Sequence, residues 1–163
     1  MKKWWPILVV LIVAALFGLY QYQKYRVAPD VIVFAQDYKD TSGKNINLGI
    51  YKGKKIIFSF WATWCGECLA EMKKLNEIRQ AEFPDVEVIM VSDEPLETIS
   101  AFAQRKKYPF TFLQLQRGFP DVGVFAIPVN YLINEKGETV YAQEGAMDWR
   151  DNSIVSMAKE SLK

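Results

Sequence analysis

The sequence contains no histidine, and this absence excludes much of enzyme chemistry. Without imidazole the chain cannot use a Ser-His-Asp or Cys-His catalytic group, nor a metal site with histidine ligands. It also lacks an excess of either charge, since 20 basic residues face 19 acidic ones and no basic patch stands out. There is therefore no electrostatic reason to expect a nucleic acid partner. Any catalysis must use thiols, carboxylates, lysine, tyrosine or the backbone.

Cysteine is almost as scarce, because Cys65 and Cys68 are the only two. A disulfide between residues this close together closes too small a loop to stabilise a fold. A zinc site would need two further cysteine or histidine ligands, and the sequence has none. The pair is therefore better interpreted as a redox-active dithiol than as a structural feature.

The length of 163 residues fits one domain plus an additional segment, which the N-terminal residues supply. After Lys3 the run 4–23 carries no charge, and its apolar part ends near Tyr20. Roughly 17 apolar residues in a helix span about 26 Å, which is enough for a thin bilayer. Tryptophans at one end and tyrosines at the other suit the two membrane interfaces. We therefore predict that residues 1–26 form a signal anchor, which consists of a transmembrane helix and a short juxtamembrane linker.

A cleaved signal peptide is the alternative for this segment. The apolar run is longer than the usual core of a signal peptide, and no small-x-small site follows it in residues 21–28. The lysines before the run compete with Lys24 and Arg26 in setting the orientation, and the N-terminal amine favours a cytoplasmic N-terminus. We predict a single-pass protein of the cytoplasmic membrane whose domain, residues 27–163, faces the periplasm or the outer surface.

Apolar periodicity and turn residues divide the rest of the chain into strands and helices. The acidic residues Asp93 and Glu94 before Pro95 are typical of a helix start, and we assign them no catalytic role. Residues 134–137 have the composition of a hairpin turn. The order of elements predicts an α/β fold with a mixed sheet sandwiched by helices. We predict strands at 31–35, 46–50, 55–62, 86–91, 111–115, 129–133 and 138–142, and helices at 66–81, 96–106 and 148–162.

The strongest signal is the segment 61–68, Trp-Ala-Thr-Trp-Cys-Gly-Glu-Cys, between a predicted buried strand and a predicted helix. A helix N-terminus carries partial positive charge and free N–H groups, which stabilise a thiolate. Cys65 lies at that start, so we predict that it attacks the substrate disulfide. Cys68 lies one turn further and faces the core, so we predict that it resolves the mixed disulfide. The segment indicates thiol–disulfide exchange.

From about Pro29 to its end the chain resembles the exported thioredoxin-like proteins of the TlpA, ResA and CcmG type. The segment 60–68 is very similar to the Phe-Trp-Ala-Thr-Trp-Cys-x-x-Cys of that family, and 127–134 resembles the segment around its cis-proline. The resemblance implies a thioredoxin-like fold with an N-terminal β extension, a cis bond before Pro128, and activity outside the cytoplasmic membrane. It also implies that the Ile127 backbone lies beside Cys65.

That backbone edge is expected to pair with an extended substrate segment. Trp64 is expected to flank the thiols as an apolar platform, whereas Trp61 better suits the core. The charge of Glu67, between the cysteines, disfavours a thiolate nearby and argues against a strongly oxidising protein. The predicted substrate-binding residues are Trp64, Gly66, Glu67, Ile127 and Pro128.

Glu71 is the candidate for proton transfer to and from Cys68. The helical wheel places it on the apolar side of the predicted helix, where burial would raise its pKa. Ser59 occupies the strand position at which thioredoxins carry a buried aspartate, and a hydroxyl is a poor general base. The alternative is a surface glutamate that pairs with Arg79 or Lys74, and periodicity does not decide between the two. The resemblance favours catalysis, because the glutamate of Cys-x-x-Cys-x-x-Glu in the family has that role.

The sequence thus predicts an enzyme that reduces disulfides in exported proteins, with no cofactor beyond the Cys65–Cys68 disulfide. Its electrons would come from a membrane thiol electron donor, since the glutathione and thioredoxin pools are cytosolic. By resemblance, apocytochrome c is an expected partner. Two alternatives stay open: a chaperone that holds Cu(I) on the two thiolates, and a disulfide-forming oxidase.

Overall fold

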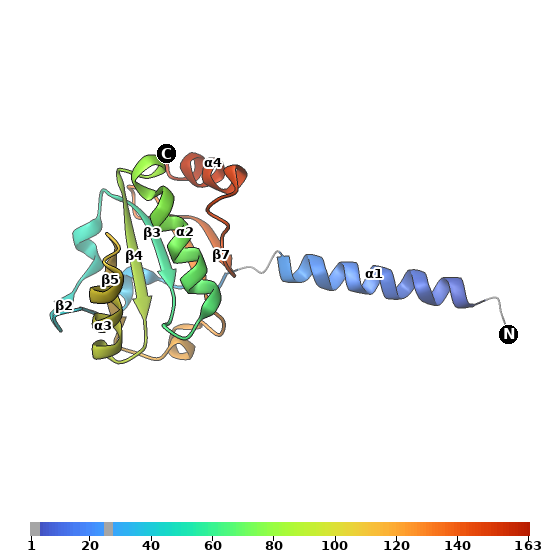
Figure 1. Cartoon of the computed structure of the whole chain (residues 1–163), viewed down its shortest axis with the longest axis horizontal. Coiled ribbons are helices and arrows are strands. Elements are labelled where there is room, and N and C mark those ends of the chain that lie inside the picture. Colours follow the sequence, from blue (N-terminus) through green and yellow to red (C-terminus); the bar gives the residue numbers. More distant parts are fainter. Residues whose placement is uncertain (1–3, 25–27) are drawn as a thin grey trace.

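The computed structural model describes the backbone of residues 4–24 and 28–163, with the side chains of all of these except 6 and 19–24. Helix α1 spans Trp5–Lys24 and takes no part in the sheet (Figure 1). In the part of the chain that is described, no helix is both long and apolar enough to cross a membrane. The predicted boundary between residues 26 and 27, and the flanking charges at 2, 3 and 26, lie outside the described residues.

The domain is built on one seven-stranded sheet with the strand order β2-β1-β5-β4-β3-β6-β7 (Figure 1). The neighbours β3, β4 and β5 run parallel, whereas β1, β6 and β7 each pair antiparallel with their neighbours. The prediction of a mixed sheet is therefore confirmed. The strands are β1 (Tyr38–Asp40), β2 (Asn45–Ile46), β3 (Lys55–Phe60), β4 (Val86–Ser92), β5 (Thr111–Leu115), β6 (Val129–Ile133) and β7 (Thr139–Glu144).

Strand β3 lies between β4 and β6 and leads directly into the cysteine motif. Residues 56–60 are all buried. Such a run of β-branched and aromatic residues is typical of a strand packed on both faces. The segment that carries the cysteines therefore begins at the buried end of a central strand.

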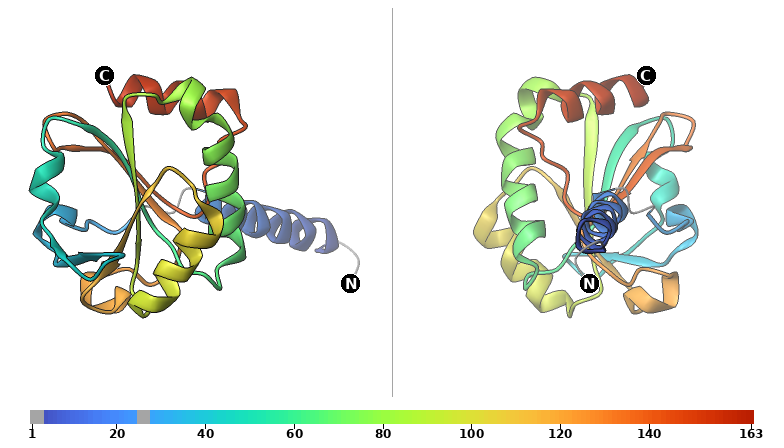
Figure 2. Two further views of the ribbon diagram at one scale, coloured as in Figure 1. Left: turned by 60° about the vertical axis from the view of Figure 1, so that its left-hand side comes forward. Right: turned by 90° about the vertical axis from the view of Figure 1, so that its right-hand side faces the viewer.

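Three α-helices cover one face of the sheet, while residues 28–34 and short 3₁₀ helices cover the other (Figure 2). The prediction of a sheet sandwiched by helices is therefore confirmed for one face only. In the described residues, the other face carries 3₁₀ helices and no α-helix. The α-helices are α2 (Gly66–Glu82), α3 (Leu96–Lys106) and α4 (Asn152–Ser161), and the 3₁₀ helices are η1 (Val33–Ala35), η2 (Leu48–Tyr51) and η3 (Phe119–Val122).

The predicted strand at 31–35 is wrong, because η1 forms there. Val31 and Val33 are buried and Ile32 between them is exposed, so the segment has the alternating burial of a strand although it is not one. However, the Val33 carbonyl accepts a hydrogen bond from the Tyr38 hydroxyl at 2.7 Å rather than from a neighbouring strand. Burial on alternate residues therefore reflects packing of an irregular segment on the sheet.

The predicted strand at 46–50 is also wrong beyond its first residue. Strand β2 ends at Ile46, and η2 begins two residues later. The Asn47 Oδ1 atom accepts the Gly49 N–H at 2.7 Å. A side chain that bonds nearby backbone in this way competes with the hydrogen bonds of a strand.

Three other boundaries differ by a few residues. Strand β3 ends at Phe60 rather than at Ala62, and β7 ends at Glu144 rather than at the predicted residue 142. The last helix begins at Asn152 rather than at 148, because the Asp151 side chain caps it by accepting the Ser153 N–H.

Candidate active site

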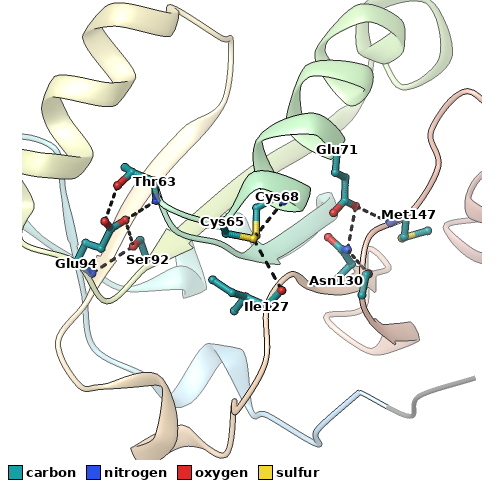
Figure 3. The surroundings of a disulfide bond; sticks show 10 residues. Thr63, Cys65, Cys68, Glu71, Ser92, Glu94, Ile127, Asn130 and Met147 are labelled. Atoms are coloured by element: carbon teal, nitrogen blue, oxygen red, sulfur yellow. Dashed lines mark hydrogen bonds between the residues drawn. A yellow bond between two sulfur atoms is a disulfide. The ribbon is translucent and has the colours of Figure 1, made fainter. Parts of the chain in front are cut away.

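The two cysteines lie where β3 gives way to α2, at the centre of Figure 3. Cys65 is the N-cap of α2 and Cys68 is in its first turn, and their sulfur atoms form a disulfide. The Cys68 N–H donates to the Cys65 Sγ at 3.2 Å. In the reduced protein the same N–H and the helix N-terminus favour a thiolate on Cys65.

The two cysteines differ in solvent exposure. Cys65 retains 7% of its accessible surface and Cys68 only 2%. Cys68 packs with Met72 and Leu75 in the core beneath α2. Cys65 is therefore the more accessible of the two to an incoming disulfide.

The loop before β6 approaches the outer cysteine closely. The Ile127–Pro128 peptide bond is cis, which agrees with what the family resemblance implied. The Ile127 carbonyl oxygen lies 3.8 Å from the Cys65 Sγ (Figure 3). Because a disulfide sulfur carries no hydrogen, this distance is a close contact rather than a hydrogen bond. Pro128 itself is buried beneath the loop.

An apolar hollow of about 440 Å³ lies beside the disulfide. Trp64 and Phe125 line it, with 72% and 82% of their surfaces exposed, although large apolar residues are usually covered. Trp61, in contrast, is buried, so the two tryptophans of the motif divide as the sequence predicted. The hollow's lining residues are Trp64, Phe119, Pro120, Val124, Phe125, Ala126 and Ile127.

Of the five predicted substrate-binding residues, the structure brings Trp64 and Ile127 together in this hollow. Gly66 and Glu67 are exposed in the first turn of α2. Glu67 lines a separate hollow, which it shares with Lys74 and Asp148. The predicted set therefore falls on two sides of the helix start.

Glu71 is buried, with 5% of its surface exposed. Its Oε1 atom accepts hydrogen bonds from three donors that lie far away in the sequence, and Figure 3 shows two of them, Asn130 and Met147. The alternative of a surface glutamate is wrong, because Lys74 pairs with Asp148 at 3.1 Å and Arg79 donates to the Val86 carbonyl. The three donors are Asn130 Nδ2 at 2.9 Å, Met147 N at 3.1 Å and Trp149 Nε1 at 3.1 Å.

Burial raises the pKa of Glu71 from 4.5 to about 7. The three hydrogen bonds and the charge of Lys74 act in the opposite direction, because they favour the ionised carboxylate, but they do not outweigh desolvation. Near neutral pH the carboxyl is therefore present in both protonation states. A group with this property, one helical turn from Cys68, can both accept and return a proton.

The three donors to Glu71 were missed by the sequence analysis. Asn130 could have been found, because it is a polar residue within β6, whose five residues are all buried. It also lies opposite Ser59 in the antiparallel β3–β6 pair. Met147 and Trp149 lie in the connection between β7 and α4, and nothing in their local sequence indicates a contact with α2.

Removing one donor should change the titration of Glu71. We expect Trp149→Phe to raise the Glu71 pKa further by about one unit or more, since a hydrogen bond to a charged group is worth about 1.5–3 kcal/mol. The inflection in the rate of disulfide exchange against pH should move upward accordingly. Phe83→Leu is the control, because it alters the ring that packs against Trp149 at 5.6 Å but retains the indole N–H. An unmoved inflection in Trp149→Phe would contradict the assignment.

The predicted helix start is confirmed, because α3 begins at Leu96, but Asp93 and Glu94 do not cap it. The N-cap of α3 is Pro95, with no side-chain capping bond. The Glu94 carboxylate instead binds the backbone N–H of Thr63 at 2.7 Å (Figure 3). Asp93 Oδ2 accepts the N–H of Phe119 at 2.9 Å. Both acids therefore contact segments beside the disulfide.

The chain is similar in sequence to known thiol–disulfide oxidoreductases. A family model described as redoxin matches residues 25–159. The chain is 34% identical over 148 residues to the thioredoxin-like protein YneN of Bacillus subtilis, a match that covers 84% of this chain and 86% of that protein. It is 28% identical over 155 residues to the thiol-disulfide oxidoreductase ResA of Bacillus cereus, covering 85% and 86% of the two chains.

Solved structures share the fold. The exposed lipoprotein thioredoxin of Streptococcus pneumoniae superposes with a TM-score of 0.58 at 28% identity, covering 76% of this chain and 97% of that one. StoA from Bacillus subtilis has a TM-score of 0.58 at 24% identity, covering 78% and 95%. At the latter identity the likeness supports the fold alone.

Proposed function

Because the chain belongs to the redoxin family and is a thiol–disulfide oxidoreductase, we propose that it reduces disulfides in exported proteins. The observation that carries this direction is the buried Glu71 behind Cys68. A buried carboxylate disfavours a nearby thiolate, and a dithiol whose thiolates are disfavoured gives up electrons readily to become a disulfide. The exposed Glu67 acts in the same direction more weakly.

The proposed reaction has two steps. The Cys65 thiolate attacks one sulfur of the client disulfide, forms a mixed disulfide and releases a client thiolate, which takes up a proton. Glu71 then removes the proton from the Cys68 thiol, and the Cys68 thiolate attacks the Cys65 sulfur. The Cys65–Cys68 disulfide forms, the second client thiolate leaves and is protonated, and two electrons have passed to the client.

Residues around the disulfide would hold the client. The Ile127 backbone, beside Cys65 and ahead of Pro128, offers an edge for an extended segment, and Trp64 covers apolar side chains that enter the hollow. Gly66 and Glu67 would border the client on the far side of the helix start. No cofactor beyond the disulfide is needed in this proposal.

The reduction potential of the Cys65–Cys68 pair tests the direction. We expect a potential below about −180 mV, on the reducing side of protein disulfide isomerase, together with reduction of insulin in the presence of dithiothreitol. A potential near −120 mV, as in DsbA, would instead make the protein a disulfide-forming oxidase. Tight Cu(I) binding without insulin reduction would favour the copper chaperone.

We also propose that residues 1–26 anchor the domain, residues 27–163, at the outer face of the cytoplasmic membrane. Supporting this, apolar side chains of α1 such as Leu11 and Phe17 are exposed, which suits contact with lipid. The electrons would come from a membrane thiol donor, and apocytochrome c is a proposed client.

The anchor has a direct test. We expect the mature protein to retain residues 1–26 and to stay with the membrane fraction after a wash at high salt, because apolar contact with lipid is not screened by ions. Mass spectrometry of the purified chain checks the N-terminus. A water-soluble form that begins beyond Tyr20 would contradict the anchor.

A further inference from the structure

Two segments form the walls of the apolar hollow, and both contact the same short stretch of chain. We name them the redox loop, residues 61–65, and the cis-proline loop, residues 119–128. The redox loop supplies Trp64 and the cis-proline loop supplies the other lining residues. Asp93 and Glu94 follow β4, the parallel neighbour of β3, and reach both loops.

Glu94 binds the redox loop with both oxygens of its carboxylate (Figure 3). Oε2 accepts the Thr63 N–H at 2.7 Å, and Oε1 accepts the Thr63 hydroxyl at 2.6 Å. The Ser92 hydroxyl donates to Oε2 at 3.1 Å, which fixes the carboxylate itself. Charge-assisted bonds of this kind are stronger than neutral ones. They hold the loop two residues before Cys65.

Asp93 binds the cis-proline loop at its start. Its Oδ2 accepts the N–H of Phe119, the first residue of η3. The Phe119 ring packs edge-on against Phe60 at 5.6 Å, so this end of the loop is fixed to the core as well. The remainder of the loop continues to Ile127, whose carbonyl lies at the Cys65 sulfur.

We infer that Asp93 and Glu94 are positioning residues that set the separation of the redox loop and the cis-proline loop, and with it the fit of a protein substrate against Cys65. The inference rests on thiol–disulfide exchange and not on its direction. A protein substrate contacts both loops, whereas a small disulfide needs only Cys65. Loss of the Asp93 contact therefore weakens exchange with proteins selectively, and loss of the Glu94 contact weakens both reactions.

The test compares two substrates on the full-length chain. For Asp93→Ala we expect kcat/KM with insulin to fall on the order of tenfold, mainly through KM, because contacts that hold the substrate equally in the ground state and the transition state are lost. The rate with hydroxyethyl disulfide should stay within about twofold of wild type, because that molecule does not span the hollow. Asp93→Asn should restore insulin reduction, since its amide oxygen can accept the same N–H. Glu97→Ala, which removes an exposed acid in the first turn of α3, is the matched control for charge.

The contact between Glu94 and Thr63 is tested by a substitution of Thr63. Thr63→Val removes one donor at constant shape, and we expect it to slow exchange with both substrates. Equal loss for both substrates in Asp93→Ala, no rescue by Asp93→Asn, or wild-type rates in Thr63→Val would each overturn the inference. If the wild type does not reduce insulin, the variants are compared with the wild type in the oxidising direction, with reduced insulin chains as the protein substrate. Failure of the proposed reductase is then distinguished from failure of this inference. Urea midpoints show whether a variant is merely less stable.

Discussion

Cys65→Ser is expected to abolish disulfide exchange, whereas Cys68→Ser should keep the first step and stop at the mixed disulfide. Cys65 is the more exposed of the two and receives the Cys68 N–H at 3.2 Å. Its thiolate is therefore both accessible and stabilised. Without Cys68 the mixed disulfide has no internal thiol to resolve it.

The measurement is the capture of clients on non-reducing gels, together with alkylation of the reduced wild type. Cys68→Ser should accumulate mixed disulfides, and Cys65→Ser should accumulate none. In the reduced protein we expect iodoacetamide to modify Cys65 first, because Cys68 is enclosed by the core. Faster modification of Cys68 would reverse the two roles and show that burial does not control them.

Glu71→Gln is expected to slow exchange on the order of tenfold, at the lower end of what general acid–base catalysis supplies. The glutamine keeps the size of the side chain and an oxygen for the three donors, but it cannot take a proton from Cys68. The rate of the wild type should rise with pH through an inflection near the Glu71 pKa of about 7, and the variant should lose that inflection. An unchanged rate and pH profile would leave the proton transfer to water.

The same variant gives a second, independent readout in stability. Burial raises the pKa of Glu71 from 4.5 to about 7 in the folded chain. Between these values the folded state binds more protons than the unfolded state, so this contribution is fully present below the unfolded value and is lost as pH rises through the folded one. The wild type should therefore lose on the order of 3 kcal/mol between pH 4 and 8 relative to Glu71→Gln, a difference that urea unfolding at both pH values can measure.

Much of the site could be predicted because its parts are close together in the sequence. The helix that starts at Gly66 sets Cys65, Cys68 and Glu71 on successive turns. Helical periodicity made Glu71 a candidate for burial, but the family resemblance was needed to prefer it over a surface glutamate. The sheet could be predicted where strands are long and fully buried, as in β3 and β6. The edge formed by β1 and β2 could not, because the turn at Asn47 depends on a single side-chain bond, whereas the opposite edge strand β7 was predicted to within two residues.

The sequence by itself determined the chemistry of this protein, since it places two thiols three residues apart at a predicted helix start and has no further cysteine or histidine for a zinc site. Only the tertiary structure decided what surrounds them. The donors to Glu71 lie 59, 76 and 78 residues away, and Glu94 reaches Thr63 over 31 residues. Periodicity fixes which residues share a face of one helix, but contacts between elements depend on the order of strands in the sheet. That order brings β4, β6 and the segment before α4 to one end of β3, where the disulfide lies.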